Sequence, residues 1–323
     1  MSRYKFTNND LVVHGFILLR ALLLAGFFSL AYLFWQLGNL FTLASVIVYW
    51  FYCALWNTWG WAGIGHELIH NSPFKSKIRN NIYLWATSFL SLSNRHLFFV
   101  THFSHHKSPH GIEDFESPYI LSNAEHKHRF VSIVNNVIDF RKFFNFWRYL
   151  FLNCLRVIPS PKLVVFLKKI KKFDIVVSNA RLIFFYVLLV ILVGSLLDCL
   201  WLLFALLIPN FVATGLVKSL ALLQHPTTKL LKAVGITEIE FKNESFPVTN
   251  FNDEFIRDRL DMYIPRWLSF FYANMNYHAS HHIRMTIPFF QLPKHSESNV
   301  QEGYVGLVSL RNPQILKLFF RAH

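Results

Sequence analysis

Four long apolar stretches constrain what this chain can fold into more than any other feature. They cover residues about 16–35, 40–65, 182–197 and 200–223. A helix of about 20 apolar residues crosses the hydrocarbon core of a bilayer, where each backbone polar group needs a partner within its own segment. The composition agrees, because 53% of the residues are hydrophobic and 15% are charged, against about 25% charged residues in soluble domains. We therefore expect an all-α integral membrane protein with four transmembrane helices in two hairpins.

The distribution of basic residues predicts the orientation of these helices. The two hairpin turns carry almost no basic residues, whereas Lys and Arg are abundant in residues 66–181. Loops rich in Lys and Arg stay on the cytosolic side of a membrane. We therefore predict a multi-pass protein with one domain, 1–323, in which both termini and the regions 66–181 and 224–323 are cytosolic. These regions are expected to form a helical cap that carries the active site. The formal net charge of +14 is explained by topology and contact with anionic lipid. We expect no nucleic-acid partner, because no basic helix or zinc-finger pattern is present.

Several shorter segments and single residues also carry expectations. Residues 82–92 are apolar but too short to span a bilayer, which predicts an interfacial helix. Arg20, near the start of the first stretch, is expected to extend toward the interface, and Pro209 is expected to kink the fourth helix. The three cysteines show no motif spacing and are expected to be small packing residues rather than disulfide partners. They are Cys53, Cys154 and Cys199.

Histidines are grouped in a way that predicts a metal site. Sixteen are present, and half of them lie in three motifs, HELIH (66–70), HFSHH (102–106) and HASHH (278–282). Residues three and four apart on a helix share a face, so each motif can present two or three imidazoles to one centre. The eight motif histidines are His66, His70, His102, His105, His106, His278, His281 and His282.

The predicted topology brings the three motifs to the same side of the membrane. The first motif closes the second apolar stretch, the second motif follows in residues 66–181, and the third lies beyond the fourth stretch. His225 lies on the same side, directly after the fourth stretch. The eight motif histidines and His225 give nine possible ligands, which are too many for one metal ion and suit two. Imidazole nitrogen is a suitable ligand for iron.

The order HxxxH, HxxHH, HxxHH, with apolar stretches before the first motif and between the last two, resembles the membrane fatty acid desaturase and hydroxylase superfamily. The similarity covers residues about 50–295 and includes the sequences HELIH, HFSHH, NYHASHH and IPFFQLP (287–293). The resemblance implies two non-haem irons bound by the eight motif histidines, with His225 completing the set and O2 as co-substrate. In some members an Asn lies one helical turn before that last histidine, whereas this chain has Ala221 there.

The resemblance also implies a reaction class. We expect O2-dependent oxidation of an unactivated C–H bond in a lipid, with fatty acyl desaturation as the first hypothesis. A lipid or carotenoid hydroxylase or ketolase of the same superfamily is the alternative. No fused electron-transfer domain is evident, so electrons are expected from a separate donor such as a ferredoxin or a cytochrome b5-like protein. Such donors are commonly acidic, and the cytosolic face, which is rich in Lys and Arg, would attract one.

Acidic residues near the motifs are candidates for a supporting role. A carboxylate that accepts the second ring N–H of a ligand histidine fixes its tautomer and orientation. Glu67, Asp114 and Glu116 are suitably placed in the sequence. The competing interpretation is that they are loop carboxylates that balance nearby Lys and Arg.

Two other functions compete with the oxidation hypothesis. HELIH also fits HExxH, in which two histidines bind zinc and the Glu acts as the base of a metalloprotease. That interpretation needs one further ligand and leaves both HxxHH motifs unexplained. A metal transporter would need polar groups at the middle of the membrane, and the apolar stretches have few.

Overall fold

The structure is a computed structural model, and it describes residues 9–60, 63–107, 114–115, 140–158, 160–213, 260–302 and 306–309. These residues are mostly helical. Within these ranges, three helical segments are long and apolar enough to cross a membrane, namely α1 (Asp10–Gln36), Asn39–Asn57, and α10 (Phe173–Leu196). The second of them consists of the 3-10 turn η1 (Asn39–Phe41) and α2 (Thr42–Asn57).

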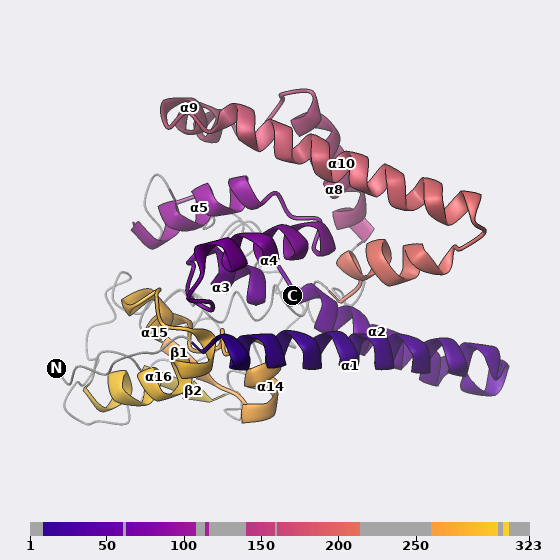
Figure 1. Cartoon of the computed structure of the whole chain (residues 1–323), viewed down its shortest axis with the longest axis horizontal. Coiled ribbons are helices and arrows are strands. Elements are labelled where there is room, and N and C mark those ends of the chain that lie inside the picture. Colours follow the sequence, from indigo (N-terminus) through magenta and orange to yellow (C-terminus); the bar gives the residue numbers. More distant parts are fainter. Residues whose placement is uncertain are drawn as a thin grey trace, which may run out of the picture.

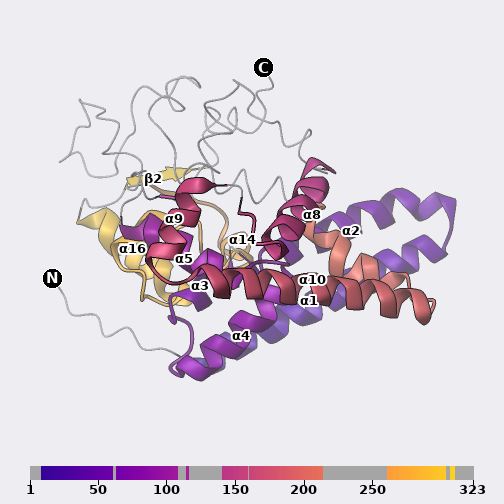
Figure 2. The same cartoon turned by 90° about the horizontal axis from the view of Figure 1, so that it is seen from above.

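Helices α1 and α2 pack side by side as an antiparallel hairpin (Figures 1 and 2). Helix α1 begins after Asn9, whose side-chain oxygen accepts hydrogen bonds from the backbone N–H groups of Leu11 and Val12. With 27 residues, α1 is about 40 Å long, which exceeds the bilayer core of about 30 Å. Its first turns therefore reach beyond the apolar layer, and they lie beside the C-terminal elements (Figure 1).

The second apolar stretch ends earlier than the predicted residue 65. Helix α2 stops at Asn57, and a separate short helix, α3 (Ile64–Ile69), carries the first histidine motif. The turn between them is closed by hydrogen bonds from the N–H of Ile64 to Thr58 O and from the N–H of His66 to Gly60 O. A Cβ on Gly63 would lie 1.9 Å from Thr58 O. Only glycine fits at this position. The turn separates α2 from α3, so the first motif lies on a helix of its own.

The third and fourth stretches also differ from the prediction. Helix α10 begins at Phe173, nine residues before the expected start at 182. After it, the described part of the fourth stretch is irregular, with a π-helix η2 (Leu203–Leu207) followed by a 3-10 turn η3 (Ile208–Asn210). Pro209 lies in this break, as its missing N–H requires. Residues 214–223 lie outside the described residues, so a fourth span stays a prediction.

Side chains of α2 hydrogen-bond to the carbonyls of this irregular segment. Tyr49 Oη donates to Phe204 O at 2.9 Å, and Tyr52 Oη donates to Ala205 O. Asn57 Nδ2 donates to Pro209 O at 2.9 Å. Non-helical backbone within an apolar layer is tolerated where neighbouring helices satisfy its polar groups. The α1–α2 hairpin is thereby tied to the segment that follows α10.

The remaining elements form a cap at one end of the three long helices (Figures 1 and 2). Its N-terminal part consists of α3, α4 (Lys77–Leu90), α5 (Arg95–Lys107), α8 (Phe140–Cys154) and α9 (Pro161–Lys169). Its C-terminal part consists of β1 (Leu260–Tyr263), α14 (Arg266–Phe271), α15 (His278–Ile283), η4 (Phe289–Gln291), α16 (Leu292–Gln301) and β2 (Gly306–Ser309). The two strands pair in parallel, with Asp261 opposite Leu307. This small sheet was not expected in an all-α fold.

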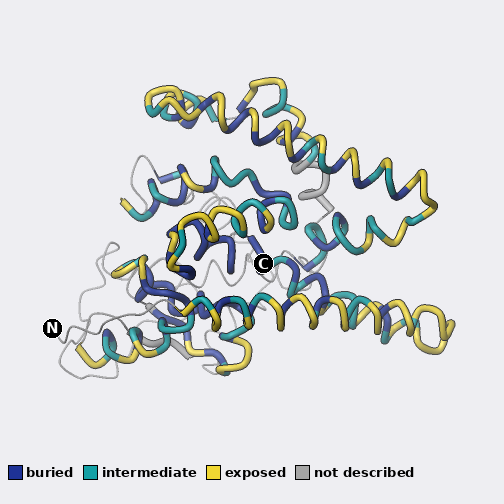
Figure 3. Tube along the Cα trace, viewed as in Figure 1, coloured by how far each residue is buried: buried dark blue, intermediate teal, exposed yellow. Residues whose placement is uncertain are grey.

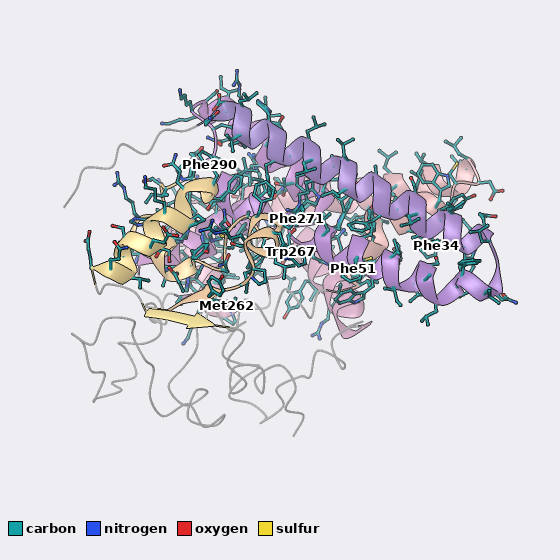
Figure 4. All side chains as sticks on the ribbon, turned by 90° about the horizontal axis from the view of Figure 1, so that it is seen from below. Phe34, Phe51, Met262, Trp267, Phe271 and Phe290 are labelled. Atoms are coloured by element: carbon teal, nitrogen blue, oxygen red, sulfur yellow. The ribbon has the colours of Figure 1, made fainter. Side chains whose placement is uncertain are left out.

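The cap and the long helices differ in how far their residues are buried. Buried residues concentrate in α3, α5 and α15, whereas exposed residues follow the outer faces of α1, α2 and α10 (Figure 3). Large apolar side chains on those outer faces are exposed, among them Leu22, Leu33, Phe51, Phe185 and Leu192. In Figure 4 the labelled residues run from Phe34, near the turn of the hairpin, through Phe51 to Phe290 in the cap. The exposed apolar surface of α1, α2 and α10 fits contact with lipid tails.

Arg20 does not extend toward the interface as expected. Its side chain is 1% exposed. It donates hydrogen bonds to Leu55 O at 2.9 Å and to Phe271 O, near the C-terminal ends of α2 and α14. The guanidinium also lies over the rings of Phe16 and Trp59, at 5.5 and 5.4 Å. Helix C-termini carry partial negative charge, which favours a cation at these two carbonyls.

The three cysteines are free thiols, as expected.

Candidate metal centre

The three histidine motifs come from three helices that lie close together in the cap. Helix α3 carries His66 and is followed directly by His70, its C-cap residue, whereas α5 carries the second motif and α15 carries the third (Figure 1). Six of the eight motif histidines are buried, and His106 and His282 are partly buried. The centre is thus shielded from solvent on most sides.

The eight motif histidines divide into two clusters. Within each cluster the possible ligand atoms all lie within 4.8 Å of one another. The first cluster consists of His66, His70, His102, His106 and His281. The second cluster consists of His105, His278 and His282. The clusters adjoin, because the rings of His106 and His282 stack with their centroids 4.2 Å apart.

This division corrects the expectation that each motif serves one centre. Successive residues of a helix are rotated by about 100°, so His105 and His106 point in different directions. The pair four residues apart stays together: His102 and His106 in the first cluster, His278 and His282 in the second. The remaining histidine of each HxxHH motif, His105 or His281, reaches the other cluster. Each HxxHH motif therefore contributes to both clusters.

The spacing between ring nitrogens tests whether the first cluster suits a metal ion. His70 Nε2 lies 2.9 Å from His102 Nε2 and 3.2 Å from His281 Nε2. His102 Nε2 also lies 2.9 Å from His106 Nε2. Two nitrogens about 2.1 Å from one ion and at right angles to each other are about 3.0 Å apart. The observed spacing fits neighbouring ligands of one ion.

The second cluster shows the same spacing, with 3.0 Å between His282 Nε2 and His278 Nε2. The cluster offers three imidazoles, and the family resemblance implies His225 as a further ligand. His225 and Ala221 lie outside the described residues, so this expectation stays a prediction.

The electrostatics of the first cluster favour neutral imidazoles. Burial lowers the pKa of His70 to about 3, and burial together with the neighbouring histidines lowers the pKa values of His102 and His281 well below the usual range. A neutral imidazole keeps one nitrogen lone pair, which is the form that binds metal. The cluster therefore presents lone pairs rather than positive charge at neutral pH.

Asp114 occupies the supporting position that was proposed for it. Its Oδ2 lies 2.9 Å from His105 Nδ1, and both side chains are fully buried. A carboxylate that accepts the Nδ1–H leaves Nε2 as the metal-facing atom and fixes the ring orientation. Glu116 lies outside the described residues.

Glu67 is also buried beside the centre, but its carboxylate is held from two other sides. Its Oε2 accepts hydrogen bonds from Ser72 Oγ at 2.7 Å and from the N–H of Phe289 at 3.0 Å. Its Oε1 lies 3.7 Å from His281 Nδ1, which is too long for a hydrogen bond. Burial raises the pKa of Glu67 to about 8, although its two donors act in the opposite direction.

No sequence pattern identified Ser72 or Phe289 as functional residues. The clue was the IPFFQLP sequence after the third motif, which was recognised only as a point of resemblance. Its Phe289 brings a backbone N–H to Glu67 and is itself fully buried. The segment after the third motif therefore anchors the first motif.

Apolar helices of membrane length, together with a buried centre of histidines fit to hold metal, define this chain as a helical membrane protein with a candidate metal site. The model of the fatty acid desaturase family matches residues 42–307, which is most of the chain. The chain belongs to the fatty acid desaturase family. Membership supports lipid oxidation by an oxidoreductase. Searches of curated proteins and of solved structures give no match.

Proposed function

We propose that this protein is an O2-dependent di-iron enzyme that desaturates a fatty acyl chain. The observation that carries the proposal is the division of the eight motif histidines into two adjoining clusters. Two all-nitrogen clusters suit two iron ions with positions left open for dioxygen. Soluble di-iron bundles differ, since they use carboxylates with Glu-x-x-His pairs.

The chain's own residues would prepare and protect the reacting position. The first cluster would hold one iron, and the second cluster, with His225, would hold the other. When bound, the two irons would activate dioxygen for hydrogen removal from an unactivated C–H bond. Asp114 keeps the His105 ring in one tautomer, and the burial of both clusters excludes water. The apolar helices next to the cap provide an environment for a lipid tail.

The contacts of Glu67 speak against the zinc metalloprotease alternative. In a protease of the HExxH type the Glu must face the metal-bound water to act as a base. Here Oε2 accepts hydrogen bonds from Ser72 and Phe289, and Oε1 lies 3.7 Å from His281 Nδ1, whereas the opposite nitrogen of that ring, Nε2, faces His70 in the cluster. A five-histidine cluster also exceeds the three protein ligands typical of catalytic zinc. The metal-transport alternative lacks support for a different reason, because both clusters lie in the cap rather than midway along the long helices.

The proposal extends to topology and partners. We infer a multi-pass protein of one domain with four spans in two hairpins, and with the cap and both termini in the cytosol. The positive-inside distribution supports this orientation. A separate ferredoxin or cytochrome b5-like protein would supply electrons at the basic face. If electron transfer from such a donor to the purified enzyme did not weaken with rising salt, the electrostatic part of this proposal would be wrong.

The test compares lipids made by the wild type and by a His281→Ala variant in a lipid-producing host. A species lacking two hydrogens, formed only by the wild type, supports desaturation. A species gaining one oxygen indicates a hydroxylase, and further loss of two hydrogens from it indicates a ketolase. His14→Ala is a matched control, because His14 is a partly buried histidine that contacts Tyr83 outside both clusters.

A metal count on the purified wild type completes the test. Two irons per chain support the proposal, whereas a single zinc ion contradicts it and favours the protease. Identical lipid profiles together with two irons would show that the host lacks the substrate or the electron donor.

A further inference from the structure

Asp261 is a buried acidic residue that the metal centre does not explain. It lies in β1, and its side chain is fully buried. Its Oδ1 accepts a hydrogen bond from the N–H of Ser280 at 3.1 Å, and its Oδ2 accepts from the hydroxyls of Ser280 and Ser296. Burying a carboxylate is costly unless hydrogen bonds compensate it, and these neutral donors do so.

Ser280 connects Asp261 to the third histidine motif. It lies between His278 and His281 on α15. The first N–H groups of a helix have no partner within the helix and are usually capped by the residue just before it. The residue in that place, Tyr277, makes no side-chain cap. Asp261 supplies the missing acceptor from a strand 19 residues away in the sequence.

The surroundings of Asp261 are tied together, so the strand is a fixed support. Met262 N–H donates to Asn276 O at 2.8 Å, and Asn276 Nδ2 donates back to Met262 O at 2.7 Å. Asn299 Nδ2 of α16 donates to Ser280 Oγ at 3.1 Å. The Asp261 carboxylate thus lies where four parts of the cap meet, namely β1, the segment before the third motif, α15 and α16.

The other buried acidic residues also support a link between Asp261 and the third motif. Among the described residues, three acidic side chains are buried: Glu67, Asp114 and Asp261. Glu67 lies in the first motif beside His281, and Asp114 contacts His105 of the second motif. Asp261 is the third, and its contacts lead to the third motif.

We propose that Asp261 is a positioning residue that sets the orientation of α15 through Ser280 and thereby aligns ligands of both metal clusters. The reason is geometric: His281 belongs to the first cluster, whereas His278 and His282 belong to the second. A small rotation of α15 therefore displaces ligands of both clusters together. This inference rests on the proposed function, because it assumes that both clusters hold metal.

The experiment measures metal binding by Asp261→Asn and Ser280→Ala in purified full-length protein. Iron retention is titrated against a chelator, and the visible spectrum of the cobalt(II)-substituted protein reports ligand geometry. We expect a roughly 10–100-fold loss of metal affinity in Asp261→Asn, as is common when support of a ligand is lost. The loss in Ser280→Ala should be smaller, with a changed cobalt spectrum in both variants.

Ser45→Ala is the matched control, because it also removes a buried serine hydroxyl, the donor to Ala31 O at 2.7 Å in the α1–α2 hairpin. It should leave metal affinity and the cobalt spectrum unchanged. A purely structural role for Asp261 would lower thermal stability and leave the spectrum of the folded protein as in wild type, and that result would overturn the inference.

Two further outcomes are decisive. If Asp261→Asn does not fold, Ser280→Ala tests the same link, and wild-type affinity with a wild-type spectrum there overturns the inference. A wild type with two irons and unaffected variants refutes only the role of Asp261. A wild type that binds no iron refutes the proposed function, and the inference with it.

Discussion

Replacing Glu67 distinguishes a supporting residue from a chemical base. In Glu67→Ala the buried Phe289 N–H loses its acceptor, whereas the Ser72 hydroxyl loses Oε2 but keeps a second acceptor, Glu67 O at 3.2 Å. A buried donor left without a partner costs about 1–3 kcal/mol, so the free energy of unfolding should fall by about that amount. Glu67→Gln keeps an acceptor oxygen, and its loss should be nearer 1 kcal/mol.

Iron retention and lipid oxidation should also fall further in Glu67→Ala than in Glu67→Gln. Glu67→Ala loosens the contact between α3 and the segment after the third motif, so we expect iron retention to fall by about 10–100-fold. Glu67→Gln should keep most of its iron and a measurable fraction of its lipid oxidation. Thermal stability in detergent, iron per chain and product formation by mass spectrometry give the three readouts.

Asn210→Ala provides the matched control. Asn210 Nδ2 donates to Leu90 O and to Leu206 O, both at 3.0 Å, and neither acceptor belongs to or adjoins a histidine motif. It should lose stability to a similar degree as Glu67→Ala while retaining iron. The reasoning is refuted if Glu67→Gln keeps its iron and stability but abolishes product formation, because Glu67 would then act in the chemistry itself.

Three further variants test other parts of the structure. Asp114→Asn weakens the acceptor for His105 Nδ1–H, and chelator titration should show a loss of about 10–100-fold in metal affinity. Arg20→Lys cannot reproduce both hydrogen bonds to the carbonyls at the ends of α2 and α14, so a loss of about 2 kcal/mol should appear as a lower melting temperature with unchanged far-ultraviolet circular dichroism. His225→Ala should retain one iron per chain, and retention of two tightly bound irons would exclude His225 as a ligand.

The sequence was informative about the ligand set because chemistry and helical spacing both act locally. All eight motif histidines lie in the two clusters. Their allocation was mispredicted, since residues three and four apart on a helix were treated as sharing one face. The actual allocation depends on where α3, α5 and α15 lie relative to one another, and these helices are far apart in the sequence.

Helix limits were harder to predict for a related reason. Hydropathy extends the second stretch to residue 65, but α2 ends at Asn57, and the turn after it brings Gly63 so close to Thr58 O that a side chain there would clash. The buried position of Arg20 also depends on a distant segment, because Phe271 O lies 251 residues away along the chain. Local composition reports which residues prefer lipid, and it does not report which carbonyls a folded chain will bring beside a cation.

The three buried carboxylates also bear on how an all-imidazole centre can tolerate metal. Neutral imidazoles bring no negative charge, so two divalent ions would add about four positive charges to a buried region, where such charge is costly without compensation. Glu67, Asp114 and Asp261 lie around that region, and each is fixed by hydrogen bonds. In their ionised forms these carboxylates offset part of the added charge without occupying a coordination position. The same side chains that orient the three motifs therefore also reduce the electrostatic cost of holding two metal ions in the cap.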